Sequence, residues 1–316
     1  MSRTRIKRAS ACCGGSEYGH APDSRLEKAP GRHFPDNLTG LHMKPSRTAF
    51  WTINGLLGLL AAITLFPLAW MLSVSLMPDG AASTFPPPLW PTHPTLANYH
   101  ALFVRADLGR YLLNSLIVSG GITLGSLCCN VLAGYGFAKL RFGGRDRTFG
   151  LLLAALVIPA QVAMMPLFLL ARELHIVNSY AGVILPSLAS IFGIYLVRQY
   201  ARAIPDEMLE AARIDGASEL TTFLRVVLPL LKPIILTLTI LTFLTAWKDF
   251  MWPLIVLTGN NHYTLPIALA SLAREHNQDV EMLMAGSMVT VLPVLVLFLL
   301  LQRYYIQGLL LGSVKR

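Results

Sequence analysis

Two neighbouring ionisable residues, Lys248 and Asp249, interrupt an otherwise apolar part of the sequence. A charge inside a bilayer costs at least about 2.5 kcal/mol on insertion scales, so such charges usually face a cavity or a partner. Neighbouring residues of a helix point in different directions, so these two need not form an ion pair with each other. We therefore expect Asp249 to line or gate a water-filled path. The alternative is that both side chains satisfy polar groups of neighbouring helices.

No catalytic motif accompanies this pair. The sequence contains no GxxxxGK[ST], no HExxH and no GxSxG pattern, so the chain is not expected to hydrolyse ATP or to act as a hydrolase. Its four cysteines form two adjacent pairs, Cys12-Cys13 and Cys128-Cys129. Because no CxxC or Cys/His spacing typical of zinc is present, we expect free thiols, no metal and no cofactor.

A second group of residues with informative spacing lies at 203–229. Pro205 can occupy a first helical turn, and Asp206 follows it near the positive end of the helix dipole. Gly216 can adopt the left-handed conformation that ends a helix, and Ser218 can cap a second one. The segment is predicted to be a helix–turn–helix hairpin. A membrane-surface hairpin without a partner would explain its apolar face, but not a helix-breaking glycine between two caps.

The composition indicates what must position these residues. Hydrophobic residues make up 54% of the 316 residues and charged residues only 14%, against about 25% in soluble domains. A bilayer-spanning helix needs about 20 mostly apolar residues. The predicted fold is therefore an all-α polytopic membrane protein with six transmembrane helices. They cover about residues 50–76, 112–138, 149–171, 176–197, 233–257 and 282–302.

Basic residues are distributed unevenly between these spans. The tail before residue 50 and the segments 139–148, 198–232 and 303–316 contain 21 of the 26 basic residues, whereas the alternate segments contain four. Cytoplasmic segments carry such an excess, so both termini are predicted to be cytoplasmic. The net charge of +9 then reflects membrane orientation, and no nucleic-acid partner is expected.

The segments outside the spans have distinct compositions. Residues 1–49 are basic, contain four prolines and lack periodicity, so a disordered cytoplasmic tail is expected. The outer segment 78–111 is rich in proline and is predicted to form an irregular cap. The polar outer segment 258–281 is either a solvated turn or a docking site. Residues 50–306 are predicted to be the transmembrane domain, and residues 307–316 a C-terminal cytoplasmic tail.

Beyond these properties, the hairpin resembles a known signature. It contains a Glu-Ala-Ala triplet, a glycine a few residues later and then Leu-Pro, which resembles the EAA signature of permease subunits of binding-protein-dependent ABC importers. The residues are Glu210, Ala211, Ala212, Asp215, Gly216, Ala217, Leu228 and Pro229. Other stretches resemble the smaller, maltose-type permease of carbohydrate uptake. They are Leu96–Tyr99, Asn114-Ser115, Ala133–Lys139, Trp247–Phe250 and Gly308–Lys315. That family commonly has asparagine where Lys248 stands.

The resemblance implies a type I ABC importer fold in the bacterial inner membrane, with the hairpin as a coupling helix that docks on a separate ATPase dimer. Glu210 would pair with a basic group of the ATPase or cap backbone donors on it. Gly216 would allow close approach, and Asp215 would stabilise the turn. ATP and Mg²⁺ would be bound by the ATPase. A second permease (as a heterodimer), an extracytoplasmic solute-binding protein and membrane lipid are the other implied partners. Gly312, Val314 and Lys315 would reach the ATPase dimer, or else form a basic end near anionic lipid.

Candidate pathway residues are polar or aromatic groups within the spans: Asn130, Gln161 and Tyr195, beside Lys248 and Asp249. Prolines such as Pro159 suggest that the third and fourth spans border the path, although kinks also have an ordinary packing explanation. Gly121 and Gly125 are predicted to permit close helix contact. Two other functions are compatible with a polytopic membrane protein. An ion-coupled secondary transporter would have related halves and midplane charges, and a membrane scaffold or enzyme is disfavoured by the lack of a catalytic constellation.

Met43 is a candidate natural start, because Met43 to Arg47 forms a short basic lead into the first span. If this is so, mass spectrometry of tryptic peptides from the natively expressed protein will recover residues after Met43 and none from residues 1–42. A single peptide from residues 1–42 would contradict the hypothesis.

Overall fold

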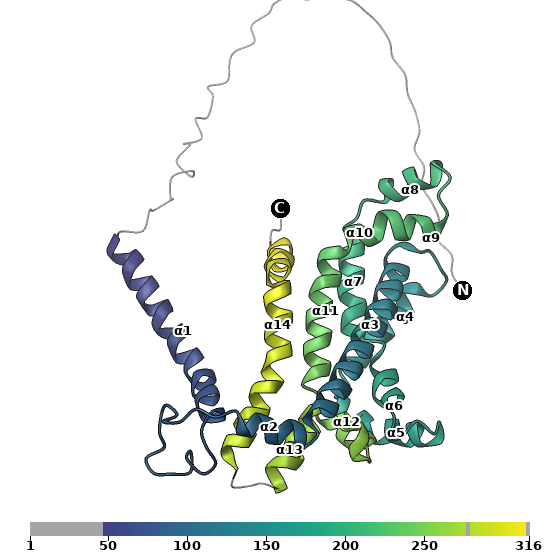
Figure 1. The fold of residues 1–316 in the computed structure, drawn as a ribbon. Coiled ribbons are helices and arrows are strands. Elements are labelled where there is room, and N and C mark those ends of the chain that lie inside the picture. The colour runs from purple at the N-terminus through teal and green to yellow at the C-terminus, as the bar shows by residue number, and fades with distance from the viewer. Residues whose placement is uncertain (1–46, 276–278, 314–316) are drawn as a thin grey trace, which may run out of the picture. The chain divides into compact units, whose positions relative to one another are not determined.

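The computed structural model describes residues 47–275 and 279–313, and in these residues every regular element is helical (Figure 1). The long and medium helices are α1 (Arg47–Ser75), α3 (Leu108–Lys139), α4 (Arg145–Ala155), α5 (Ala160–Glu173), α7 (Ile191–Arg202), α11 (Lys232–Trp247), α13 (Leu265–Glu275) and α14 (Val280–Ser313). The shorter ones are α2 (Ala97–Val104), α6 (Tyr180–Ile184), α8 (Asp206–Ile214), α9 (Glu219–Thr222), α10 (Leu228–Leu230) and α12 (Met251–Val256), with single turns η1 (Leu185–Ser187), η2 (Phe223–Val227) and η3 (Asn260–His262). The all-α prediction is confirmed for the described residues.

The chain divides into two units, residues 1–58 and 59–316. The described part of the first unit is the beginning of α1, and all packing discussed below lies within the second. The predicted tail, Met43 and Cys12-Cys13 fall outside the described residues, as do Val314 and Lys315. Cys128 and Cys129 are free thiols, as predicted.

Three described helices are long and apolar enough to cross a membrane: Phe50–Ser75, Leu108–Lys139 and Val280–Leu300. Up to six spans result if each of three bent helix pairs forms one span. The pairs bend by 103° between α4 and α5, 41° between α6–η1 and α7, and 74° between Glu219–Leu230 and α11. Exposed large apolar side chains cover α1, among them Trp51 and Phe66 (70% and 60% exposed), as expected of a surface that faces lipid or a partner.

The predicted span 149–171 is not one straight helix. Pro159 precedes α5 in an extended conformation (φ −60°, ψ 133°). Its ring removes an amide donor from the backbone, so α4 does not continue into α5. Likewise the predicted span 233–257 breaks at Lys248, where α11 ends.

The segments 78–111 and 258–281 are more ordered than predicted. The predicted irregular cap 78–111 contains α2, and the polar segment 258–281 contains η3 and α13. The backbone N–H of Ala82 donates to Oε1 of Glu281 at 2.7 Å, and the Glu281 side chain is buried at the start of α14. This contact holds the proline-rich segment against α14.

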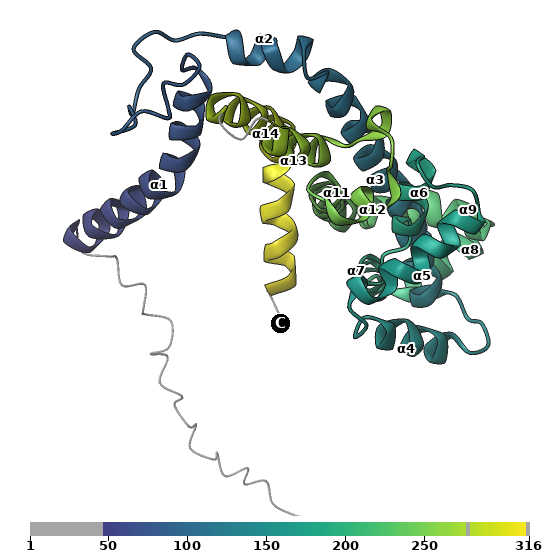
Figure 2. The same cartoon turned by 90° about the horizontal axis from the view of Figure 1, so that it is seen from below.

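Helix α3 is the centre of the packing in this unit, with its most extensive contacts to α7 and α11 (Figures 1 and 2). The predicted close contact at Gly121 and Gly125 is confirmed, because a Cβ there would lie 2.9 Å from Ile184 Cδ1 and 2.3 Å from Leu188 Cδ2. At Gly134 a Cβ would lie 2.5 Å from Cβ of Val197 in α7. Only glycine permits this approach.

Replacement of Gly134 by alanine tests this packing. Gly134→Ala is expected to lower the free energy of unfolding by about 1–3 kcal/mol, the usual cost of overpacking a well-filled interface. The matched control is Gly120→Ala on the same helix, where nothing lies within 4 Å of the added Cβ. It should leave stability unchanged or raise it by about 0.5–1 kcal/mol, since alanine is the better helix former. Thermal and denaturant unfolding in detergent measures both, and equal stabilities of the two variants would contradict the packing.

Candidate functional site

The turn after α8 is fixed by a complete set of backbone hydrogen bonds. Gly216 has φ +83°, and its N–H donates to Arg213 O at 3.0 Å, while the N–H of Ala217 donates to Ala212 O at 2.9 Å. These two bonds form a Schellman motif, the helix end that glycine in the left-handed region allows. The predicted end of the first helix is confirmed at Gly216.

The second arm begins as the sequence predicts. Oγ of Ser218 accepts a hydrogen bond from the N–H of Thr221 at 3.2 Å and caps α9. The guanidinium of Arg213 in α8 bonds Oε1 of Glu219 in α9 at 2.7 Å, which joins the two arms across the turn. After α9 the chain makes the π-helical turn η2 and continues through α10 to α11.

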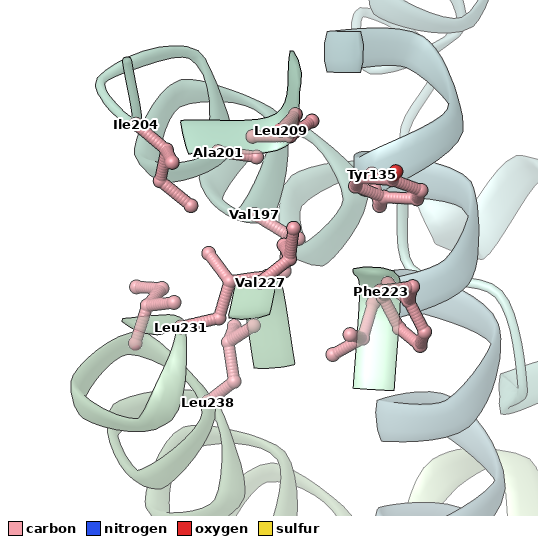
Figure 3. Close-up of a cluster of buried hydrophobic side chains, with 11 residues drawn as sticks. Tyr135, Val197, Ala201, Ile204, Leu209, Phe223, Val227, Leu231 and Leu238 are labelled. Carbon is pink, nitrogen blue, oxygen red and sulfur yellow. The ribbon is translucent and has the colours of Figure 1, made fainter. Parts of the chain in front are cut away.

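The hairpin has one buried and one exposed side. Leu209 is 2% exposed and belongs to a buried apolar cluster with residues of α3, α7, η2 and α11 (Figure 3). The signature residues Glu210, Ala211, Asp215 and Gly216 are exposed, and Ala212 and Ala217 are half-buried. Among the described residues Glu210 has no ion-pair partner. The apolar side chains of Met208, Ile214 and Leu220 are exposed by 43%, 86% and 64%.

The end of α3 holds both arms of the hairpin. Lys139 Nζ donates to Oδ1 of Asp206 at 2.6 Å and to the carbonyl oxygen of Ile204. The hydrogen bond and the positive charge of Lys139 lower the pKa of Asp206 below its usual value, so Asp206 stays ionised in neutral and mildly acidic solution. The ring of Tyr135 packs against Phe223 with centroids 4.9 Å apart.

A cavity of about 850 Å³ opens between the hairpin and the loop after α3. Its lining includes five basic and three acidic side chains: Lys139, Arg141, Arg145, Arg202, Arg213, Asp206, Glu210 and Glu219. Charged groups that line a surface cleft are suited to bind polar groups of another molecule.

The three polar pathway candidates occupy separate places. Asn130 is 1% exposed, donates to Ser126 Oγ at 2.8 Å and accepts from the N–H of Ser190 at 3.0 Å, so its amide links α3 to the start of α7. Tyr195 stacks on Phe149 with centroids 6.5 Å apart. Gln161 is exposed in the first turn of α5.

Lys248 and Asp249 lie at the break between α11 and α12. Lys248 is exposed and ends α11, whereas the half-buried Asp249 carboxylate accepts hydrogen bonds from the backbone amides of Met251 and Trp252. Among the described residues the two side chains form no ion pair with each other. Nε1 of Trp247 donates to Thr290 O at 3.1 Å and ties this break to α14.

The other end of α3 also carries a buried polar cluster. Asn114 Nδ2 donates to the carbonyl oxygens of Asn261 and Tyr263, each at 2.9 Å, and Asn114 Oδ1 accepts from the Tyr180 hydroxyl at 2.7 Å. The N–H of Leu265 donates to Ser115 Oγ at 2.7 Å. Sequence reasoning assigned no separate role to Asn114, Tyr135 or Lys139. Two signals were available: all three lie near the ends of the long uncharged run 111–138, and they belong to stretches that resemble the permease family.

A cavity of about 880 Å³ lies at this end, among α2, α13 and the beginnings of α3 and α14. Polar and aromatic groups line it, among them Asp79, His100, Arg105, Tyr111 and Tyr263. Segment 258–281, for which the sequence leaves a solvated turn or a docking site open, thus forms part of a concave surface together with the predicted cap 78–111.

Comparison with known proteins gives one consistent family. Residues 130–310 match the family described as "Binding-protein-dependent transport system inner membrane component". The chain is 37% identical over 279 residues to the arabinooligosaccharides transport system permease protein AraQ of Halalkalibacterium halodurans, covering 86% of this chain and 99% of that one. It is 31% identical to the lactose transport system permease protein LacG of Rhizobium radiobacter (82% and 94% covered). The sn-glycerol-3-phosphate transport system permease protein UgpE of Escherichia coli K12 is also 31% identical (84% and 97%).

A solved structure shares the fold. A chain of a bacterial ABC transporter involved in the import of the acidic polysaccharide alginate superposes with a TM-score of 0.72 at 24% identity, covering 82% of this chain and 98% of that one. The family match includes the whole hairpin with its Glu210–Ala217 signature. The chain therefore belongs to the inner-membrane permease components of binding-protein-dependent transport systems.

Proposed function

We propose that this chain is one of two permease subunits of an ABC importer and that its hairpin α8–α9 receives mechanical work from a separate ATPase dimer. One observation carries the proposal: Glu210 and its neighbours stand exposed on a helix whose end is fixed by the turn at Gly216. A rigid, exposed turn whose carboxylate has no ion-pair partner in the described part of the chain is suited to dock into a cleft and to transmit force. ATP and Mg²⁺ belong to the ATPase.

Two further features support docking by a protein partner. Exposed apolar side chains lie within the signature at Ile214 and just after it at Leu220, and burial of such groups stabilises protein interfaces. The charged cavity beside Glu210 supplies complementary polar groups. In addition, Gly312, Val314 and Lys315 are proposed to contact the ATPase dimer, of which Val314 and Lys315 lie outside the described residues.

We place the chain in the bacterial inner membrane as a type I importer subunit with six spans and both termini in the cytoplasm. The distribution of basic residues supports this orientation. Each bent pair then acts as one broken span, a form tolerated where neighbouring helices or a cavity satisfy the freed backbone groups. A second, different permease subunit completes the path, and lipid covers the remaining apolar surface.

The transported solute is proposed to be a sugar or a sugar-like compound. Relatives named for arabinooligosaccharides, lactose and sn-glycerol-3-phosphate support this class. An extracytoplasmic solute-binding protein delivers the solute, and the outer cavity beside α2 and α13 is the surface offered to it. Asn130, Gln161, Tyr195, Lys248 and Asp249 stay candidates for the path itself.

Reversal of the charge at Glu210 tests the coupling site. Glu210→Lys is expected to weaken binding of the ATPase subunit about 30-fold or more, equivalent to about 2 kcal/mol, because a like charge replaces a complementary one. Gly216→Pro should abolish docking as well, since proline cannot adopt the positive φ and lacks the N–H that bonds Arg213. Pull-down of the ATPase and ATP-dependent uptake into proteoliposomes measure the effects.

The matched control for this test is Glu173→Lys, the same charge reversal at an exposed acid at the end of α5. It should retain both binding and uptake, and the affinity of the solute-binding protein for its solute should be unchanged in every variant. Normal uptake by both hairpin variants would show that energy does not enter through the hairpin. Uptake that is driven by an ion gradient without ATP would favour a secondary transporter.

Asp249 can be tested separately as a gate. Asp249→Ala and Asp249→Asn should both lower uptake and solute-stimulated ATPase activity by at least about tenfold if a charged carboxylate lines the path, a loss in the range of one hydrogen bond to a charged group. Asparagine keeps an acceptor for the amides of Met251 and Trp252. If Asp249→Asn transports normally and only Asp249→Ala fails, Asp249 caps α12 and the gate hypothesis is wrong.

A further inference from the structure

We propose that α3 is the element that transmits motion of the hairpin to the far end of the subunit, with Lys139 and Asn114 as its two attachment residues. The inference rests on the proposed function, because it says how a movement that the ATPase imposes on the hairpin is passed to the rest of the subunit. It is carried by the contacts at the two ends of one uninterrupted helix.

The first attachment is Lys139, the last residue of α3. Its side chain is 6% exposed, although its partner Asp206 is 71% exposed. The enclosed ammonium group contacts Ile204 O in the turn before α8 and Oδ1 of Asp206 in the first turn of α8. An enclosed charge is strongly destabilised when it loses its partner. The start of α8 is therefore expected to follow the end of α3 when either moves.

The second contact with the hairpin lies one turn earlier on the same face of α3. Tyr135 and Lys139 are four residues apart, so their side chains are neighbours on the helix surface. Tyr135 packs on Phe223 after α9, and its hydroxyl donates to Oε2 of Glu219 at 3.4 Å (Figure 3 shows the two rings). One face of α3 thus contacts both arms of the hairpin. Because there are two contacts, the hairpin cannot rotate relative to α3 about either one alone.

The covalent route from the hairpin to α11 is less direct. Between α9 and α11 the chain passes through the π-helical turn η2 and a bend of 74°. Pro229 and Pro233 lie on this route and remove backbone donors from it. A π-helical turn is a local irregularity that is frequent at functional sites. Motion of the hairpin reaches α3 through short side-chain contacts, whereas it reaches α11 through a bent and irregular connection.

Helix α3 carries the motion over its whole length. Its 32 residues form one helix, about 48 Å long at 1.5 Å per residue. At the far end Asn114 is 3% exposed and makes three hydrogen bonds, to Asn261 O, Tyr263 O and the Tyr180 hydroxyl. The segment ahead of α13, which borders the outer cavity, is therefore attached to the same rod as the hairpin.

The test measures transport per ATP hydrolysed by the complete transporter in proteoliposomes. Lys139→Gln is expected to lower this ratio about tenfold or more, because the neutral amide loses the ion pair with Asp206, while binding of the ATPase subunit is retained. Lys139→Arg keeps the charge and the donors and should restore most of the ratio. Asn114→Leu, at the other end of α3, should lower the ratio in the same way.

Arg147→Glu is the matched control. Arg147 is an exposed cation in the first turn of α4, the helix that follows α3, and it forms no ion pair among the described residues. This variant should leave the ratio unchanged. The inference is overturned if Lys139→Gln has the wild-type ratio, or if it loses ATPase binding as Glu210→Lys does, since Lys139 would then only shape the docking surface. Uptake by the wild-type assembly that needs no ATP overturns the proposed function, and this inference with it.

Discussion

The close approach of α3 and α7 determines how the rest of this subunit is arranged. At Gly134 the two helices are so close that a Cβ would also lie 3.1 Å from the backbone N of Arg198. Arg198 uses this proximity: it donates to Phe137 O at 3.2 Å, pairs with Asp146 at 3.3 Å and lies over the ring of Phe149 at 3.8 Å. One side chain thus joins α7 to α3 and to the start of α4. The hairpin that follows α7 is consequently held against a fixed base.

The hairpin combines a buried anchor with an exposed surface. Leu209, Phe223 and Val227 are buried in one cluster with α3 and α7, so both arms contribute to the core (Figure 3). The burial of each large side chain stabilises the fold by roughly 1.5–3 kcal/mol. The Arg213–Glu219 pair and the turn at Gly216 then fix the shape of the part that projects. A surface held in this way can dock without the loss of conformational entropy that ordering a flexible loop would cost.

The sequence predicted the parts of this architecture that depend on local signals. The hairpin was predictable because Gly216 and Ser218 act within one turn of the helix that each ends or begins. The relative direction of two helices has no comparable local signal in the sequence. The length of the apolar run 149–171, for example, does not predict the 103° bend between α4 and α5 near Pro159. The pairing of Lys139 with Asp206 spans 67 positions in the chain. Nothing in the spacing of either residue identifies the other.

The pair Lys248 and Asp249 shows how an expected role changes once the backbone is known. A carboxylate in an apolar segment needs compensation, and the sequence alone points to a water-filled path or to a neighbouring helix. In the structure the break after Trp247 exposes the first amides of α12, and Asp249 accepts from two of them. Unpaired amides at a helix start favour a negative group. The carboxylate thus has two amide donors on its own chain. A residue of the path would also have to face solvent with its remaining acceptor capacity.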